Sequence, residues 1–324
     1  MAGDWFKSKN YRLKIISVWR GPAIPVNIRR ACATRPQSRR ILEANGSRML
    51  FQQISDWNDA YSNGPNIPGG ERWPQAWVAP AQAFRDELQG RARLDLAYGD
   101  RPRQRFDLFM PEAHPAGLVV FVHGGFWIKL DKSYWSHLAR GAVASGYAVA
   151  MPSYTLCPEV RIADITREVA AAIAQAATMI DGPIMLTGHS AGGQLVTRMI
   201  SETSPLPESL RARIRHTVSI SGLHDLRPLL RIAMNADLGI DSTEAETESP
   251  ALLQPLPGAR VTCWVGGAER PEFIRQNALL ANIWLGLGAK TCCIEEPGRH
   301  HFNVLDGLAD PGHPLVRALV SDSQ

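Results

Sequence analysis

Two patterns of apolar residues alternate along most of the chain. Continuous apolar runs predict buried strands, whereas apolar residues that recur every three or four positions predict amphipathic helices. The clearest helical recurrence consists of Ile162, Ile165, Val169, Ile173, Ala176 and Ile180. Extended runs predict strands at residues 94–98, 105–110, 117–122, 147–151, 184–186, 216–221, 261–265 and 291–294. Strands and helices in alternation are typical of a mostly parallel, doubly wound sheet.

The remaining segments have weaker patterns. Gly-Asp at residues 99–100 is a turn signal that predicts a hairpin between the first two strands. Further helices are predicted at residues 131–145 and 272–287. Residues 222–258 are rich in Pro, Asp and Glu and predict an excursion over the sheet, in the form of a small cap. The tryptophan-containing residues 56–88 predict an ordered lead-in that packs over the body.

Charge is distributed unevenly along the 324 residues. Residues 1–48 contain eleven Lys and Arg against two acidic residues, a formal charge of +9, which leaves −5 for residues 49–324. We therefore predict a basic N-terminal extension over residues 1–48, which is a transit peptide, a disordered arm or a non-native segment. A single domain is predicted over residues 49–324, beginning at Met49. No known nucleic-acid-binding module accompanies the basic residues, so no nucleic-acid partner is expected.

Composition narrows the protein class further. No apolar run reaches roughly 18 residues, so no membrane span is expected. The cysteines are odd in number and lack metal-ligand spacing, which predicts reduced thiols in a cytoplasmic protein. They are Cys32, Cys157, Cys263, Cys292 and Cys293. The adjacent Cys292 and Cys293 are interpreted as packed strand residues. We predict no metal site, no cofactor and a small-molecule substrate as partner, and a homodimer is left open.

The central candidate chemistry follows the strand predicted at residues 184–186. There the chain reads Gly-His-Ser-Ala-Gly at residues 188–192, followed by apolar residues at helical spacing. Gly-x-Ser-x-Gly between a strand and a helix is the pattern of a nucleophile elbow, in which the glycines let the backbone turn sharply around the serine. Ser190 is therefore the candidate nucleophile. The alternative is an ordinary turn between a strand and a helix.

A second turn that contains glycine follows the third predicted strand. The sequence His-Gly-Gly-Phe-Trp at residues 123–127 allows backbone N–H groups to approach a ligand closely. Such groups stabilise the oxyanion that forms when a nucleophile attacks a carbonyl carbon. We predict an oxyanion hole formed by the amides of Gly124 or Gly125 and of Ala191. The alternative for residues 123–127 is a plain glycine turn.

A serine nucleophile needs a histidine base that is itself held by a carboxylate. In hydrolases with such an elbow, the order along the chain is Ser, acid, His. Of the nine histidines, His300 and His301 follow the last predicted strand in a loop that contains glycine, from which a base can reach the elbow. Glu269 follows the next-to-last predicted strand and is the leading candidate for the acid. Asp225, after the strand before that, and Glu272 are the alternatives.

Six stretches of the chain occur together in one known family. They are residues 106–111 (FDLFMP), 123–127 (HGGFW), 154–161 (YTLCPEVR), 188–192 (GHSAG), 221–229 (SGLHDLRPL) and 269–273 (ERPEF). From about residue 56 to its end the chain resembles the kynurenine formamidase (arylformamidase) branch of the α/β hydrolases, close to esterases of the hormone-sensitive-lipase type. The resemblance implies an α/β-hydrolase fold with a small excursion or cap.

The resemblance also implies a role for each candidate residue. Ser190 is the nucleophile, Glu269 stands at the position of the acid, and His301 is the base, with His300 at a neighbouring, non-catalytic position. One departure concerns the acid, because formamidases commonly have Asp at the position of Glu269, and Glu is one methylene longer.

The residues and the resemblance together predict a serine hydrolase of N-formyl arylamines, in particular N-formyl-L-kynurenine, that works through a formyl-serine intermediate. Because a formyl group is small, the acyl side of the pocket is expected to be narrow. Phe126 and Trp127 are candidates for restricting this pocket and for stacking on the aromatic ring of the substrate, the alternative being that they only pack. A carboxylesterase of small acyl or aryl esters and a catalytically inactive binding protein are the alternative functions.

Overall fold

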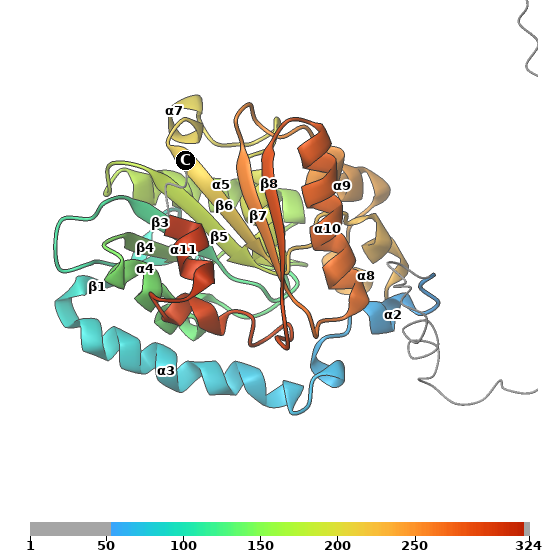
Figure 1. Cartoon of the computed structure of the whole chain (residues 1–324), viewed down its shortest axis with the longest axis horizontal. Helices are drawn as coiled ribbons and strands as arrows, with labels where there is room; N and C mark the ends of the chain where they lie inside the picture. The colour runs from blue at the N-terminus through green and yellow to red at the C-terminus, as the bar shows by residue number, and fades with distance from the viewer. Residues whose placement is uncertain (1–52, 321–324) are drawn as a thin grey trace, which may run out of the picture. The chain divides into compact units, whose positions relative to one another are not determined.

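The structure is a computed structural model that describes residues 53–320. The predicted N-terminal extension, residues 1–48, and the predicted start of the domain at Met49 lie outside the described residues. Within them, eight strands form one sheet in the order β1-β2-β4-β3-β5-β6-β7-β8 (Figure 1). The strands are β1 (Ala92–Ala97), β2 (Arg105–Phe109), β3 (Leu118–Val122), β4 (Ala148–Pro152), β5 (Ile184–His189), β6 (Ile214–Ile220), β7 (Arg260–Gly266) and β8 (Lys290–Glu296).

The sheet is parallel except at one side. Strand β2 pairs with both β1 and β4 in antiparallel orientation, and every other pairing in the sheet is parallel. The predicted hairpin and the predicted mostly parallel sheet are both confirmed. Because the parallel strands run in the same direction, the loops that follow β3, β5, β6, β7 and β8 emerge at the same edge of the sheet.

Helices connect the strands and flank the sheet (Figure 1). The α-helices are α2 (Trp57–Ala60), α3 (Trp73–Leu88), α4 (Arg140–Ala144), α5 (Ile162–Ala177), α6 (Ala191–Arg198), α7 (Glu208–Arg211), α8 (Asn235–Leu238), α9 (Ser242–Thr247), α10 (Pro271–Gly286) and α11 (Pro314–Val320). Residues 53–320 contain no helix that is long and apolar enough to cross a membrane. The helix predicted at residues 162–180 corresponds to α5, and the one at 272–287 corresponds to α10.

Two hydrophobic cores lie on opposite faces of the sheet, because successive side chains of a strand point to opposite sides. In β3, Leu118, Val120 and Val122 belong to the core that contains residues of α5, α6 and α10. Val119 and Phe121 belong to the core that contains residues of α3, α4 and α11. All five residues of β3 are buried, which confirms that this strand is covered on both faces.

The helix predicted at residues 131–145 is wrong over most of its length. This segment forms two 3-10 turns, Lys132–Tyr134 and Ser136–Ala139, before the short helix α4. The ion pairs of Lys132 account for the irregular backbone at the start of this segment. Its buried Nζ lies 2.7 Å from Asp107 Oδ1 and 2.7 Å from Asp95 Oδ1. A buried ammonium group needs such partners, so tertiary contacts override the local helical pattern here.

The sequence patterns do not predict α3, a helix of 16 residues in the tryptophan-containing lead-in. Its buried residues do recur at helical spacing; they are Trp77, Ala81, Phe84 and Leu88. Two prolines obscure this recurrence. Pro74 lies in the first turn, where it costs no hydrogen bond, whereas Pro80 lies inside the helix. Aromatic packing favours the helix despite Pro80, since the rings of Trp77 and Trp135 are 4.3 Å apart.

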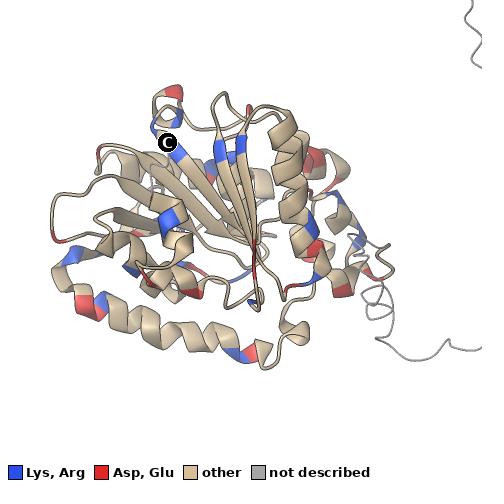
Figure 2. Cartoon of the chain, viewed as in Figure 1, with Lys and Arg blue, Asp and Glu red and all other residues tan. Residues whose placement is uncertain are grey.

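Strand β8 is more exposed than its sequence suggests. The four cysteines within residues 53–320 are free thiols, and Cys292 and Cys293 in β8 are exposed. The prediction that these two are packed strand residues is therefore wrong. The reason is the position of β8 at the end of the strand order, with β7 as its one neighbour. The charges of β8 stand at its two ends, Lys290 at the start and Glu295 and Glu296 at the finish (Figure 2).

Residues 222–258 leave the sheet after β6 and return at β7 through short helices, as predicted for an excursion. A buried ion pair ties this excursion to α6. Arg198 Nε lies 3.1 Å from Glu248 Oε2, and the two side chains are 5% and 6% exposed. Thr166 Oγ1 on α5 donates a further hydrogen bond of 2.6 Å to Glu248 Oε2. The carboxylate therefore joins the excursion to two helices of the body.

We expect Arg198→Met to lower the free energy of unfolding by about 3 to 5 kcal/mol, because it leaves the Glu248 carboxylate buried without its counter-ion. Urea denaturation at pH 7 measures this difference. Arg167→Met is the matched control, since Arg167 pairs with Asp164 and the two side chains are 64% and 39% exposed. Exposed ion pairs contribute about 0 to 1 kcal/mol to stability. Equal losses in the two variants would contradict the role assigned to the buried pair.

Candidate active site

Ser190 lies in a sharp turn between β5 and α6. Its backbone has φ 55° and ψ −116°, a region that residues with a side chain rarely adopt. The two flanking glycines make this turn sterically feasible. A Cβ on Gly188 would overlap the backbone of Gly192, and a Cβ on Gly192 would overlap the carbonyl oxygen of Val122. The glycines of the predicted elbow are therefore required by close backbone contacts, and they place Ser190 at the end of β5.

Glu269 and His301 are in contact. His301 Nδ1 lies 2.6 Å from Glu269 Oε2, and both side chains are buried. The other oxygen, Glu269 Oε1, accepts hydrogen bonds from the backbone N–H of Gly266 at 2.8 Å and from Ser221 Oγ at 2.5 Å. Oε1 of the carboxylate is thus fixed by β7 and by the residue that follows β6. Oε2 holds the imidazole of His301.

Ser221 was not singled out in the sequence. It has a positive φ of 51° directly after β6, and this conformation turns its hydroxyl toward Glu269. The sequence feature that could have indicated Ser221 is its position at the end of a predicted strand, directly before Gly222.

His301 is held beside the elbow by His189, the residue that precedes Ser190. His189 Nε2 donates a hydrogen bond of 2.9 Å to the carbonyl oxygen of His301, and the two rings are 4.5 Å apart. Phe273 packs on the same imidazole at 4.4 Å. Among the described residues, Ser190 Oγ makes no hydrogen bond to His301. Hydrogen bonds between a nucleophile and its base are often long before substrate binds.

The loop after β3 lies directly against the candidate nucleophile. A Cβ on Gly124 would be 3.1 Å from Ser190 Cβ and 2.9 Å from the carbonyl oxygen of His189. Gly125 has a φ of +113°, which favours glycine. Among residues 53–320, the amides of Gly124, Gly125 and Ala191 have no hydrogen-bond acceptor. The three amides predicted for the oxyanion hole therefore lie in the two loops that meet at Ser190, and their N–H groups are not used by other described residues.

Phe126 and Trp127 are both buried, at 8% and 0% exposure. Trp127 Nε1 donates to Gln194 Oε1 at 3.1 Å, and Gln194 Nε2 donates to the carbonyl oxygen of Glu248 at 2.9 Å. This position supports the packing interpretation for Trp127 rather than stacking on a substrate ring. Gln194, a residue of α6 that sequence reasoning missed, connects the loop after β3 to the excursion.

The alternative acids and base have other partners. Asp225 accepts two hydrogen bonds from the side chain of Arg227. Glu272 accepts from Tyr61 Oη at 2.7 Å and pairs with Arg275. His300 packs edge-on against Trp73 at 5.1 Å. Of the three candidate carboxylates, it is Glu269 that contacts the imidazole of His301.

Several other histidines are buried as neutral groups. Burial lowers the pKa of His123 to about 4 and that of His224 to about 3, and it holds the pKa of His189 well below its ordinary value. His123 Nδ1 donates to the carbonyl oxygen of Gly124 at 2.6 Å, and its ring stacks on Tyr154 at 4.3 Å. These contacts give His123 a structural role. Within residues 53–320, no three His, Cys, Asp or Glu side chains are grouped to hold a metal ion.

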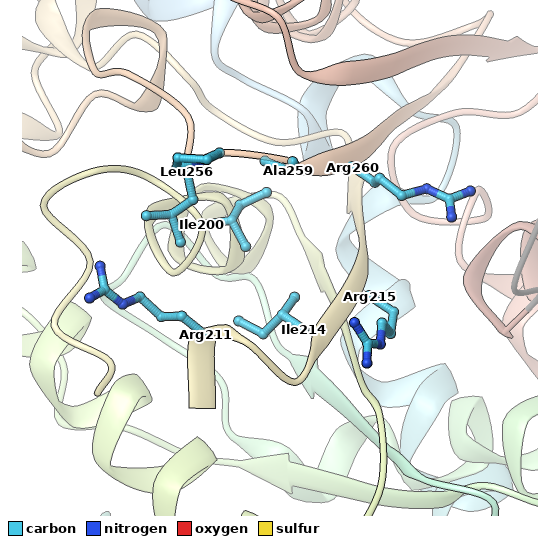
Figure 3. A pocket seen from close by; sticks show the side chains of 9 residues that line it. Ile200, Arg211, Ile214, Arg215, Leu256, Ala259 and Arg260 are labelled. Atoms are coloured by element: carbon cyan, nitrogen blue, oxygen red, sulfur yellow. The ribbon is translucent and has the colours of Figure 1, made fainter. Parts of the chain in front are cut away.

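A small hollow with a cavity volume of about 50 Å³ lies away from these residues (Figure 3). It is lined in part by residues at the starts of β6 and β7, whereas the candidate catalytic residues follow the ends of β5, β7 and β8. The guanidinium groups of Arg211, Arg215 and Arg260 point away from one another around it (Figure 3). Because the three charges do not converge, the hollow lacks the geometry of an anion site.

The fold and the contacts around Ser190 agree with the comparison to known families. A family model for the alpha/beta hydrolase fold matches residues 119–302, and the chain belongs to this family. This range contains the glycine turn after β3, the elbow, Glu269 and His301. The predicted fold class is therefore confirmed.

Individual relatives narrow the class to hydrolases. The chain is 26% identical to kynurenine formamidase of Danio rerio, over 70% of this chain and 80% of that protein. It is 28% identical to kynurenine formamidase of Drosophila melanogaster, over 72% and 82%. A crystal structure of a proposed thioesterase from Silicibacter sp. is 52% identical and covers 82% of this chain and 99% of that one, with a TM-score of 0.79. The resemblance to kynurenine formamidases is thus confirmed, and the chain is a hydrolase.

The buried histidines predict how stability depends on pH. Since the pKa values of His123 and His224 are lower in the folded state than their ordinary value of 6.5, the unfolded state binds more protons below that pH. The stability that these two neutral histidines contribute is fully present above pH 6.5. It is lost as the pH falls toward their pKa values in the folded state. The expected loss at pH 4 is on the order of 3 kcal/mol per histidine.

Denaturation curves between pH 7.5 and pH 4 measure this loss. His224→Gln should reduce the pH dependence, because glutamine does not titrate. His114→Gln, at an exposed position, should leave it unchanged. A pH dependence that is the same in all three proteins would contradict the assignment.

Proposed function

We propose that the protein hydrolyses N-formyl arylamines, with N-formyl-L-kynurenine as the leading substrate, to the free arylamine and formate. The observation that carries the proposal is the 2.6 Å contact between His301 and Glu269, held beside Ser190 by the hydrogen bond of His189. The kynurenine formamidases of zebrafish and fruit fly support the substrate class, since each aligns with 70% or more of this chain.

In the proposed reaction, Ser190 Oγ attacks the formyl carbon while His301 Nε2 takes the hydroxyl proton. Glu269 accepts the hydrogen bond of Nδ1–H, which fixes the tautomer and stabilises the imidazolium ion that forms. The oxyanion accepts hydrogen bonds from the amides of Ala191 and of Gly124 or Gly125. Each such donor typically contributes about 10²- to 10³-fold in rate.

The leaving group requires His301 to act as a general acid as well as a general base. An arylamine anion does not leave readily, so the imidazolium must protonate the amide nitrogen as the C–N bond breaks. Water, deprotonated by the same imidazole, then attacks the formyl-serine ester and releases formate. Acid and base steps therefore alternate at one nitrogen atom, His301 Nε2.

Ester or thioester hydrolysis is the second candidate function, and it uses the same three residues. The similarity that favours it is the 52% identity to the proposed thioesterase from Silicibacter sp.. An isoprenylcysteine methylesterase homologue of Arabidopsis thaliana, 31% identical over 34% of this chain, points in the same direction. An ester needs no protonation of its leaving group by a strong acid, so the two functions differ most in how they depend on His301 as an acid.

A comparison of kcat/KM for N-formylkynurenine, p-nitrophenyl acetate and a short acyl-CoA thioester separates the candidates. We expect the formamide to have the highest kcat/KM. Turnover of the formamide at the background rate, together with efficient cleavage of either ester, would overturn the formamidase proposal. Ser190→Ala should abolish all three activities and the labelling of the protein by a fluorophosphonate probe, and an unlabelled wild-type protein would instead favour a binding function.

The contacts of the carboxylates predict which of them supports catalysis. Glu269→Gln should lower kcat by about 10²- to 10⁴-fold, because an amide does not stabilise the imidazolium ion or the required tautomer. Asp225→Asn is the matched control, since Asp225 pairs with Arg227 instead of His301, and its kcat should stay within a few-fold of the wild type. The reverse order of effects would assign the acid to Asp225.

A further inference from the structure

The end of strand β6 lies between the candidate nucleophile and the candidate acid. Strand β6 has β5 and β7 as its neighbours in the sheet (Figure 1). The carbonyl oxygen of Ile220, the last residue of β6, accepts a hydrogen bond of 2.8 Å from the backbone N–H of Ser190. The next backbone N–H, that of Ser221, donates to the carbonyl oxygen of Trp264 in β7 at 2.7 Å. One peptide unit therefore joins the elbow to the strand that leads to Glu269.

Ser221 has a backbone conformation that favours glycine. Its φ of 51° lies in the left-handed region, which residues with a side chain rarely adopt, and it is close to the φ of 55° at Ser190. Such a conformation costs free energy and persists only where the surroundings enforce it, often at functional sites. Glycine would adopt the same φ without this cost. The presence of serine at this position therefore points to a role for its hydroxyl group.

The hydroxyl group of Ser221 contacts the candidate acid directly. Ser221 Oγ donates to Glu269 Oε1 at 2.5 Å, and the backbone N–H of Gly266 donates to the same oxygen at 2.8 Å. Ser221 is 0% exposed, so this hydrogen bond is shielded from solvent. The other oxygen, Oε2, contacts His301 Nδ1 at 2.6 Å. A glutamate side chain has one more rotatable bond than an aspartate, and the two donors on Oε1 restrict its rotation.

We propose that Ser221 is a positioning residue, whose hydroxyl group orients the Glu269 carboxylate so that Oε2 faces the imidazole of His301. This inference rests on the proposed function in one respect, the use of Ser190, Glu269 and His301, which formamide and ester hydrolysis share. The carboxylate must keep one orientation while the imidazole gains and loses a proton, because it stabilises the imidazolium ion. A misplacement of about 1 Å in such a supporting group can cost about 10²-fold in rate.

Two substitutions separate the hydroxyl group of Ser221 from its backbone conformation. Ser221→Ala and Ser221→Gly both remove the hydroxyl group, but glycine adopts a positive φ readily and alanine does not. We expect each variant to lower kcat by about 10- to 100-fold and to leave KM nearly unchanged, with N-formylkynurenine and with p-nitrophenyl acetate. If Ser221→Ala fails to fold, Ser221→Gly alone gives the answer. A wild-type kcat in Ser221→Gly would overturn the proposal, because the backbone conformation and not the hydroxyl group would then be required.

Ser219→Ala is the matched control. Ser219 is also buried in this part of the chain, but its hydroxyl group contacts His224 Nε2 at 3.2 Å and not the candidate acid. The variant should keep a kcat close to that of the wild type. A loss of kcat equal to that of Ser221→Ala would contradict a specific role for Ser221.

A double-mutant cycle tests whether Ser221 acts through the carboxylate. In the Glu269→Gln background, Ser221→Ala should have little further effect on kcat, because the carboxylate that the hydroxyl group orients is already absent. If Ser221→Ala instead lowers kcat by the same factor in both backgrounds, its role is independent of Glu269 and the proposal fails.

A crystal structure of Ser221→Gly tests the orientation without any substrate. We expect the Glu269 carboxylate to be rotated or to occupy more than one orientation, with a longer contact to His301 Nδ1. A carboxylate that keeps its single orientation would overturn the proposal. This measurement is independent of the reaction, so it decides the role of Ser221 even if the wild-type protein cleaves neither substrate, in which case the proposed function fails by itself.

Discussion

The strained turn at Ser190 is the constraint on which the site depends. A residue with a side chain adopts φ 55° only when its surroundings enforce it. Here the backbones of β3, β5 and α6 approach so closely that a Cβ at Gly188 or Gly192 would overlap a neighbouring backbone. The same close approach places Gly124 beside Ser190. One steric arrangement therefore positions both the candidate nucleophile and the candidate oxyanion hole.

The parallel sheet brings the remaining groups to the same edge. Ser190, Glu269 and His301 follow β5, β7 and β8, and Ser221 follows β6. Loops at the carboxyl ends of parallel strands meet, which is why open sheets of this kind carry their sites there. Glu269 then has three hydrogen-bond partners, from Gly266, Ser221 and His301. The additional methylene of Glu, compared with Asp, is thus accommodated by contacts to two strands.

Contacts outside the reacting groups connect the site to the rest of the protein. A continuous set of hydrogen bonds runs from the loop after β3 through α6 to the excursion, by way of Trp127, Gln194 and Glu248. Arg198 pairs with the carboxylate of the same Glu248. On the other side, Tyr61 and Phe273 connect the segment after α2 to His301. The loops that carry the candidate chemistry are therefore fixed by buried polar and aromatic contacts.

The sequence by itself determined the features that depend on local pattern: the strands of the sheet, the hairpin, the elbow at residues 188–192 and the glycine turn after β3. It left Asp225 beside Glu269 as a candidate acid, it missed α3, and it gave no reason to select Ser221 or Gln194. Those features were decided by the tertiary structure, because they depend on which side chains meet across segments far apart in the chain. Burial at an edge strand such as β8, and a hydrogen bond such as that between Glu269 and His301, are properties of the assembled sheet and are absent from any single stretch of residues.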